Sequence, residues 1–513
     1  MLASAHLPMT ASDFHGDARA ILLTAVNFID RITKKFRLTR KILEAATLDI
    51  AKKFLDDGNP QDALEHLKKI LPTIDENDEW RIHELIGATF HDLANPEGSA
   101  QAYFNAARTD KFLRSQRGHF SNYLFALHYL PQLDAETLSN ELAIYNSLYR
   151  DVEPLTNSFL IPNSKFHIAF VAPHFLDSSA ARFYESLLTD FDREKFSVTA
   201  WSLSGDEDNF TKKIRRNVDG YFDISETSFE EAAIKIRDAG ADILFDLGGH
   251  TEGGSTLQIA AYKPCRVQLT GIGYFDSTGL DAIDYFVGDE FLTTGAHFTE
   301  KILSLENAFA FRPNATMIRE RSQRRPFPHK NFTFGCLNNF MKLNDEYLAA
   351  VKKILDALPD AQIIFRDTTP LASRQRALVE RLKNFGIERA QIRRGADNFF
   401  TDYSEIDLIL DAFPYPGGMM TALALYMNVP VLNLRGELPS SRTGADILHI
   451  AGVDDLIVAD EETFIDTAIE LAENRARLAD LTEKISVDKL TDTKTFVADF
   501  YAKLSQTLGL SVN

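Results

Sequence analysis

Apolar residues follow a helical spacing in the first part of the chain and alternate between strand-like and helix-like runs in the rest. Up to about residue 150 they recur at the period of amphipathic helices. From Phe166 onward, short apolar runs such as FHIAFVA (166–172) and FTFGC (332–336) alternate with helical stretches. Because strands that alternate with helices form parallel, doubly wound sheets, we expect an α/β chain with two Rossmann-like domains after an all-α helical domain.

The helical part contains an internal repeat. LDIAKKFLDDGNPQDALEHLKKIL matches HELIGATFHDLANPEGSAQAYFNAA, with Phe54 opposite Phe90 and Ala51 opposite Gly87. Small residues fall where two helices would cross closely, and the pattern resembles tetratricopeptide repeats. A third, degenerate unit covers 121–134. Such an array either stabilises only itself or presents a concave surface to a partner.

Changes of composition along the chain predict six segments. They are a helical lead at 1–40, repeats at 41–155, a Rossmann-like domain at 160–312, a linker at 313–330, a second Rossmann-like domain at 331–485 and a C-terminal helix at 486–513.

Composition narrows the function classes. The formal net charge of −19 argues against nucleic acid as the main partner, since phosphate binding needs a basic face. The two cysteines, Cys265 and Cys336, indicate neither a disulfide framework nor a metal cluster. The sequence also lacks the pattern of a signal peptide and any run of about 18 apolar residues. We therefore expect a cytoplasmic protein with no membrane span.

Polar residues in the first Rossmann-like domain come directly after apolar runs. Asp246 and His250 flank a glycine pair after one run, and Tyr274, Asp276 and Ser277 follow the next. Because ligands of open α/β sheets bind at the carboxyl ends of the strands, we expect these residues to line one cleft.

His250 is our candidate general base toward an acceptor hydroxyl, and Asp246 would orient it or accept a proton itself. The alternative is that His250 only caps the turn. His174 and Asp177, beyond the first strand, are weaker candidates. We interpret the histidines of the helical part, His128 among them, as structural.

The second Rossmann-like domain offers groups suited to phosphate. Gly417 and Gly418 stand between a strand end and a helix, where free backbone amides can meet an anion. Asn338, Asn339 and Lys342 follow the first strand of this domain, and Lys342 would neutralise phosphate charge. The alternatives are a plain strand-to-helix turn and a surface lysine.

Five motifs together resemble one family. DILFDLGGHT, YKPCRVQLTGIGYFDSTGLDAIDY, GCLNNFMK, LDAFPYPGG and SSRTGAD look like the catalytic region of the O-linked N-acetylglucosamine transferase/SPINDLY family, in order and spacing, over about residues 120–480. That family also carries tetratricopeptide repeats ahead of its catalytic region. The resemblance implies a GT-B enzyme that inverts the anomeric centre without a metal. It would move a sugar from a nucleotide donor in the second domain to serine or threonine of a protein on the acceptor side, in the first.

The resemblance also assigns residues. Lys342 falls on the family's diphosphate-contacting lysine, Asn339 on a Gln or Asn near the phosphates, and His250 on the histidine of a Gly-His-Thr motif. We predict His250, Lys342 and Asp246 to be catalytic. The residues predicted to bind the donor are Asn339, Gly417, Gly418, Met419, Met420, Thr421, Arg442 and Tyr274.

The chain departs from the family after the paired glycines. Where the family has three threonines, the run is Met419, Met420 and Thr421, and Leu423 stands where an acidic residue holds the ribose. These changes remove hydrogen bonds of roughly 0.5–1.5 kcal/mol each. Two alternatives would account for them: a flagellin glycosyltransferase that uses a CMP-activated nonulosonic acid, and a non-catalytic scaffold with a vestigial pocket.

The expected partners are an acceptor protein docked on the helical repeats and a nucleotide-sugar donor, which is a substrate. No metal-binding motif occurs in the sequence, and we expect neither a metal nor a cofactor.

Overall fold

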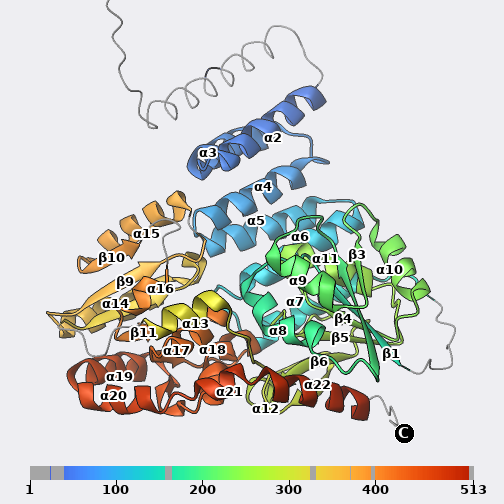
Figure 1. Ribbon diagram of the computed structural model, residues 1–513. Helices are drawn as coiled ribbons and strands as arrows, with labels where there is room; N and C mark the ends of the chain where they lie inside the picture. Colours follow the sequence, from blue (N-terminus) through green and yellow to red (C-terminus); the bar gives the residue numbers. More distant parts are fainter. Residues whose placement is uncertain are drawn as a thin grey trace, which may run out of the picture.

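The computed structural model describes residue 24 and residues 40–155, 165–323, 331–369, 371–393 and 399–507. Most of the predicted helical lead lies outside these residues. Figure 1 shows a helical array above two α/β domains that stand side by side. The predicted fold class, two Rossmann-like domains after an all-α part, is confirmed.

The array consists of antiparallel helices joined by short turns. Its helices are α2 (Arg40–Asp56), α3 (Pro60–Ile70), α4 (Glu79–Asp92), α5 (Pro96–Thr109), α6 (Leu113–Leu127) and α7 (Ala135–Ser147), with a 3-10 turn at Leu71–Thr73.

The repeat seen in the sequence has a structural origin in how its helices start and cross. Both α3 and α5 begin with proline after an asparagine, and the Asn95 side chain accepts a hydrogen bond from the Gly98 amide at 2.8 Å. Proline suits the first helical position because its missing N–H would have no partner there. Gly87 on α4 allows close crossing, since a Cβ there would lie 2.8 Å from the ring of Tyr103 on α5.

The first α/β domain is built on a seven-stranded parallel sheet of order β3-β2-β1-β4-β5-β6-β7. Its strands are apolar and mostly buried on both faces, as parallel sheets covered by helices require. The strands are β1 (Phe166–Ala172), β2 (Phe196–Ser202), β3 (Gly220–Asp223), β4 (Ile243–Asp246), β5 (Val267–Gly271), β6 (Tyr285–Asp289) and β7 (Lys301–Leu305). The helices are α8 (Ser179–Thr189), α9 (Asn209–Asn217), α10 (Phe229–Asp238), α11 (Ser255–Ala260), α12 (Glu290–Thr293) and a 3-10 turn at Thr251–Gly254.

The second α/β domain has a six-stranded sheet of order β10-β9-β8-β11-β12-β13. The strands are β8 (Thr333–Leu337), β9 (Gln362–Arg366), β10 (Ala390–Arg393), β11 (Leu408–Leu410), β12 (Val431–Leu434) and β13 (Ile457–Val458). The helices are α14 (Asp345–Ala357), α15 (Ala372–Asn384), α16 (Phe400–Tyr403), α17 (Met419–Tyr426), α18 (Pro439–Ile450), α19 (Glu461–Glu473), α20 (Arg475–Glu483), α21 (Val487–Thr491) and 3-10 turns at Phe340–Lys342 and Asp454–Leu456.

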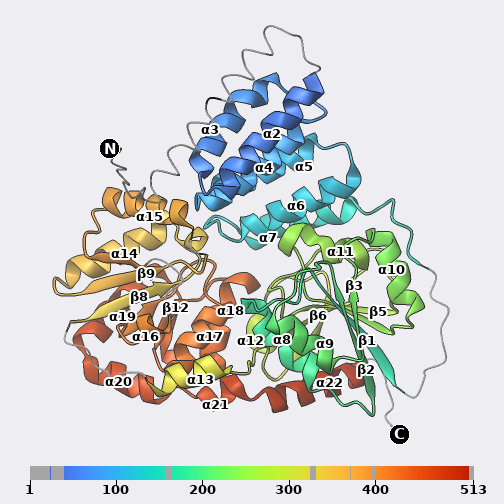
Figure 2. The same ribbon diagram turned by 45° about the horizontal axis from the view of Figure 1, so that its top comes forward.

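The C-terminal helix returns to the first α/β domain. Helix α22 (Thr493–Thr507) runs beneath the first domain (Figures 1 and 2). The Tyr501 hydroxyl donates to the Leu187 carbonyl at 2.7 Å, and the Phe500 ring stacks on Phe245 at 5.7 Å between centroids. The polypeptide therefore crosses between the two domains twice, once between β7 and β8 and once through α21 and α22.

The segment predicted as a linker, 313–330, contains a helix near its start. Helix α13 (Ala315–Ser322) begins there, because the Asn314 side chain accepts a hydrogen bond from the Met317 amide at 2.9 Å. Met317 is buried against the second cavity described below. Residues 324–330 lie outside the described part of the chain.

Helices α6 and α7 belong to the core of the first α/β domain as much as to the array. Leu124 and Leu142 share one apolar cluster with Leu244 of β4 and Leu257 of α11. Within the residues that the structure describes, no helix has the length and apolar character needed to cross a membrane.

Candidate active site between the two sheet domains

A cavity of about 310 Å³ lies between the two α/β domains and is closed on one side by the end of α6. Aromatic and amide side chains from separate segments of the chain converge on it. Its lining includes Phe125, Tyr129, Tyr274, Phe275, Asn338, Asn339, Lys342, Tyr415, Gly418, Met419 and Met420. A neighbouring cavity of about 560 Å³ shares Ser179, Thr368, Met419 and Met420 with it, so the cleft continues between α8 and α17.

Lys342 is the cation of the first cavity. Its Nζ donates to the Pro416 carbonyl at 2.6 Å and lies 3.7 Å from the centroid of the Tyr415 ring. Burial lowers the pKa of the Lys342 ammonium to about 8, and the negative charge of Asp411 partly offsets this effect. An anion bound in the cavity would favour the charged form, so the site is suited to phosphate.

Asn339 stands beside Lys342 at the start of the 3-10 turn. Its side-chain oxygen accepts hydrogen bonds from the Met341 amide at 3.0 Å and from the Arg374 guanidinium at 2.9 Å. Because both bonds use the oxygen, the amide nitrogen is the group that can donate to a ligand in the cavity.

The glycine turn before α17 is organised by Asp411, at the end of β11. This buried carboxylate accepts hydrogen bonds from the Gly417 amide at 2.8 Å, the Thr421 hydroxyl at 2.9 Å and Asn433 at 3.1 Å. Gly417 and Thr421, both predicted to bind the donor, therefore face Asp411 and do not line the cavity. Gly418 and the first amides of α17 face the cavity, since the amides of the first turn of a helix have no carbonyl partner within it.

Met419 and Met420 line both cavities, and Leu423 lines the second one. The positions where the resembled family has hydroxyl and carboxyl groups thus present thioethers and an isobutyl group to the cleft. Met419 is 5% exposed and packs into the main core, so it shapes the wall of the cleft. A ligand would be held here by shape and main-chain amides more than by side-chain hydroxyls.

His250 does not line the cavity, which corrects its predicted position. Its ring is fully buried, with Nδ1 2.7 Å from the Ser121 hydroxyl and Nε2 3.0 Å from the Thr278 carbonyl. The carbonyl can only accept, so Nε2 carries the proton and Nδ1 accepts from Ser121. Burial lowers the pKa of His250 to about 3. The physical reason is the preceding turn, where Gly249 has a positive φ of 52° and directs the next residue toward α6.

Asp246 is likewise turned away from the cleft and does not contact the His250 ring. Its carboxylate accepts hydrogen bonds from the Gly248 amide at 2.9 Å, the Gly249 amide at 3.0 Å and the Thr270 hydroxyl at 2.8 Å. It therefore holds the glycine turn after β4, in the way that Asp411 holds the turn in the second domain.

Arg442 is placed outside the first cavity, against its predicted role in donor binding. Its Nη1 donates to the Thr294 carbonyl at 2.6 Å and to the Leu292 carbonyl at 3.3 Å. These contacts join α18 of the second domain to α12 and the residue after it in the first. Arg442 lines a third cavity, of about 380 Å³, between α7, the segment at 295–297 and the start of α18.

His174 and Asp177 lie near the cleft in different ways. Nε2 of His174 is 3.3 Å from the Glu252 carboxylate, which raises the pKa of the half-buried imidazole. Asp177 lines the second cavity and forms an ion pair with Arg182.

Residues at the end of α6 and directly after it are the part of the site that the sequence patterns did not indicate. Tyr129 packs on Tyr415 at 5.4 Å between centroids, and Phe125 packs on Phe275 at 5.8 Å. His128, interpreted from the sequence as a structural histidine of the array, bonds to Tyr274 of the cavity wall through Nε2 at 3.2 Å. The sequence signal that existed is the unusual aromatic run at the end of the third repeat unit, YLFALHYL at 123–130.

Comparison with known proteins places this arrangement in a family. The profile described as Glycosyl transferase family 41 matches residues 145–353 and 311–504. The protein named "Probable UDP-N-acetylglucosamine--peptide N-acetylglucosaminyltransferase SPINDLY" of Solanum lycopersicum is 26% identical over 382 residues, which cover 70% of this chain and 40% of that protein. The SPINDLY protein of Arabidopsis thaliana, which carries the same name, is 28% identical over 339 residues, which cover 62% of this chain and 36% of that protein.

A solved structure shares the fold over most of the chain. It is a lysine-to-methionine mutant of the O-GlcNAc transferase of Thermobaculum terrenum, with a TM-score of 0.77 and 23% identity, covering 91% of this chain and 98% of that one. The chain spans about two fifths of the length of the curated relatives that it matches.

Proposed function

Because the chain belongs to glycosyl transferase family 41, we propose that it is a protein glycosyltransferase that moves a sugar from a nucleotide-diphosphate donor to a serine or threonine hydroxyl of an acceptor protein. N-acetylglucosamine on UDP is the first donor to consider, since it is named for both SPINDLY relatives. The observation that carries the proposal is Lys342, a cation seated beside the start of α17 in a cavity between two Rossmann-like domains.

The geometry suits stabilisation of a departing diphosphate. As the acceptor oxygen attacks the anomeric carbon, negative charge develops on the phosphate oxygens of the leaving group. The Lys342 ammonium and the free amides at the start of α17 can meet that charge without rearrangement. This arrangement needs no metal ion, and the reaction inverts the anomeric carbon if the acceptor attacks opposite the leaving group.

The acceptor protein would approach along the helical array. Support comes from α6, whose end forms part of the cavity wall, so a polypeptide bound on the array lies next to the site of transfer. The relatives offer no support for the nonulosonic-acid alternative, as both are named for N-acetylglucosamine.

Replacing Lys342→Met tests the proposal, because methionine keeps the length of the side chain and removes its charge. We expect donor affinity to fall roughly 10–100-fold, from the loss of one charged hydrogen bond. We expect kcat to fall about 10²–10³-fold. Calorimetry with UDP-N-acetylglucosamine measures the first effect, and the intact mass of acceptor proteins measures the second.

Lys353→Met is the matched control. Lys353 is an exposed residue of α14 that pairs with Glu461, and its replacement should leave both quantities within about twofold. Unchanged transfer by Lys342→Met would remove this lysine from the mechanism. Failure of the natural protein to bind any of a set of UDP-, GDP- and CMP-sugars would instead support the scaffold alternative.

A further inference from the structure

We propose that Tyr274, His128, Ser440 and Asp276 form a proton path that carries away the proton of the acceptor hydroxyl. The path leads from the first cavity, the one that holds Lys342 and is called the transfer cavity below, to the third cavity. The path rests on the proposed function, because a hydroxyl nucleophile must lose one proton for each sugar transferred. It also fills a gap in that function, since His250 and Asp246 both face away from the transfer cavity.

The four groups lie one after another in space, and three parts of the fold contribute them. Tyr274, after β5, lines the transfer cavity and has its hydroxyl 3.2 Å from Nε2 of His128, the residue that caps the C-terminus of α6. Nδ1 of His128 is 3.0 Å from the hydroxyl of Ser440 on α18. The Asp276 carboxylate accepts hydrogen bonds from the Ser440 amide, at 3.4 Å, and from the Ser440 side chain, and it lies 3.9 Å from Nδ1 of His128.

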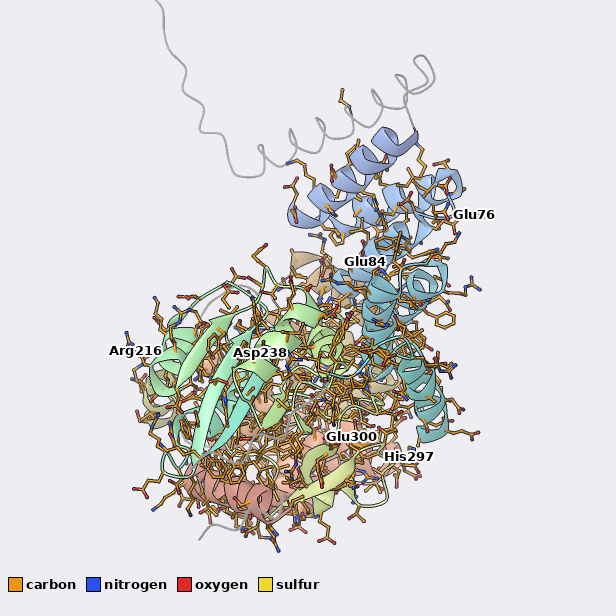
Figure 3. All side chains as sticks on the ribbon, turned by 90° about the vertical axis from the view of Figure 1, so that its right-hand side faces the viewer. Glu76, Glu84, Arg216, Asp238, His297 and Glu300 are labelled. Atoms are coloured by element: carbon orange, nitrogen blue, oxygen red, sulfur yellow. The ribbon has the colours of Figure 1, made fainter. Side chains whose placement is uncertain are left out.

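All four residues of the path are buried, and the path ends at the third cavity. The exposed fractions of the four residues are 2% for Tyr274, 3% for His128, 2% for Ser440 and 1% for Asp276. Asp276 is nevertheless one of the residues that line the cavity of about 380 Å³ beside α7, together with His297, Glu437 and Arg442. Figure 3 labels His297 and Glu300, which lie near each other in that view. A proton that reaches Asp276 therefore has titratable groups and a route to solvent ahead of it.

The protonation states suit a relay in which charge does not accumulate on the middle members. Burial lowers the pKa of His128 to about 3, so its ring is neutral. Burial raises the pKa of the Tyr274 phenol, which keeps its proton. Burial also raises the pKa of Asp276 to about 7, in reach of a proton from the relay at physiological pH.

Asp276 is faced by charged or titratable groups from every element packed around it. Glu300, ahead of β7, raises the pKa of Asp276 by repulsion, and the Ser277 and Ser440 amides oppose that effect. His128 faces it from α6. Arg442, Glu437 and His297 face it across the third cavity.

The transfer of protons balances. The acceptor hydroxyl gives its proton to the Tyr274 oxygen as the phenol proton moves to Nε2 of His128. The proton on Nδ1 moves to the Ser440 oxygen, and the Ser440 proton moves to the Asp276 carboxylate. One proton enters at the transfer cavity and one arrives at Asp276, with the acceptor oxygen left to form the bond to the sugar.

A purely structural role is the competing explanation, because the same four groups join three parts of the fold. The two explanations differ in their kinetics. A structural contact would change stability and substrate affinity, whereas a proton path changes kcat and the pH profile.

Ser440→Ala and Asp276→Asn in the full chain test the path, with Ser441→Ala as the control. The Ser441 hydroxyl donates to the Leu438 carbonyl at 2.7 Å, next to the path but outside it. Ser440→Ala should lower kcat at least about 10-fold and Asp276→Asn about 10²-fold, each with the donor KM within about twofold, as expected for lost general-base assistance. In the natural protein kcat should fall as the pH drops through about 7, and Asp276→Asn should remove that fall.

Either of two kinetic results would overturn the path: Ser440→Ala with the same kcat as Ser441→Ala, or an Asp276→Asn variant that keeps the natural pH profile. Infrared titration of the Asp276 carboxyl distinguishes a failure of the path from a failure of the proposed function, because it requires no turnover. A protonated carboxyl that titrates near pH 7, and whose titration shifts in Ser440→Ala, supports the path even if no donor is found. A carboxyl that is ionised throughout, or is unaffected by Ser440→Ala, refutes it.

Discussion

Replacing Asp276→Asn should stabilise the protein at alkaline pH much more than at acidic pH. The carboxyl group is 1% exposed, and its two backbone donors, the Ser277 amide at 2.8 Å and the Ser440 amide at 3.4 Å, are too few to replace its hydration. An asparagine oxygen can accept the same hydrogen bonds without acquiring a charge. The substitution therefore removes the ionisation of this group and little else.

The magnitude follows from the pKa of Asp276, which burial raises from 3.8 to about 7. Because the folded state binds the proton more tightly, the stabilising contribution is complete below about pH 4 and is lost as the pH rises through about 7. At 1.36 kcal/mol per pKa unit, full ionisation in the folded protein costs about 4 kcal/mol. Between about pH 5 and about pH 8 the loss is roughly 2.5 kcal/mol.

Thermal unfolding at these two pH values is the assay. A chain of 513 residues has an unfolding entropy of about 1 kcal/mol/K, so the advantage of Asp276→Asn over the natural protein should grow by roughly 2–3 °C from about pH 5 to about pH 8. Asp480→Asn, on the exposed face of α20, is the control and should show no such growth. An Asp276→Asn variant that loses stability at the higher pH would show that Asp276 is a stabilising carboxylate, and the reasoning would fail.

Three further outcomes follow from the cleft. Binding of a nucleotide diphosphate should restore the lowered pKa of Lys342, so calorimetry at about pH 8.5 in buffers of different ionisation enthalpy should reveal proton uptake, which Lys342→Met abolishes. Arg374→Met should lower the free energy of unfolding by about 3–5 kcal/mol in chemical denaturation and weaken donor affinity, because this fully buried guanidinium bonds to Asn339. Unaltered donor affinity would show that the bond from Arg374 to Asn339 does not support donor binding. Gly249→Ala should lower stability by more than about 2 kcal/mol in denaturant titrations, because its Cβ would lie 2.3 Å from the Tyr274 ring at a positive φ; a neutral effect would contradict the described packing.

The parts of the site that could be predicted are those fixed by a strand end. Alternating strands and helices identify a parallel sheet, and residues directly after a strand must stand at its carboxyl edge. Lys342, Asn339 and Tyr274 follow strands in this way, and the structure places all three at the transfer cavity. Gly418 is placed by the same rule, because it precedes the helix that leaves the edge.

The parts that could not be predicted depend on directions within a turn. A strand end defines the edge but not which side chain of a tight turn points outward. His250 and Thr421 both follow glycine turns. His250 hydrogen-bonds to Ser121, which is distant in the sequence, and Thr421 hydrogen-bonds to Asp411 on the other side of its turn. His128 could not be identified because a buried histidine in an amphipathic helix looks the same whether it packs or relays protons.

The helical array is attached more firmly to the first α/β domain than to the second, and this difference determines how the cleft can open. Helices α6 and α7 share an apolar core with the first domain. Toward the second domain the array offers polar links, such as the His91 carbonyl to Arg374 at 3.1 Å and the Asp92 carbonyl to Ser373 at 2.8 Å. If the two α/β domains moved apart, the array would stay with the first domain, and its polar links to the second domain would break together with the packing of Tyr129 on Tyr415.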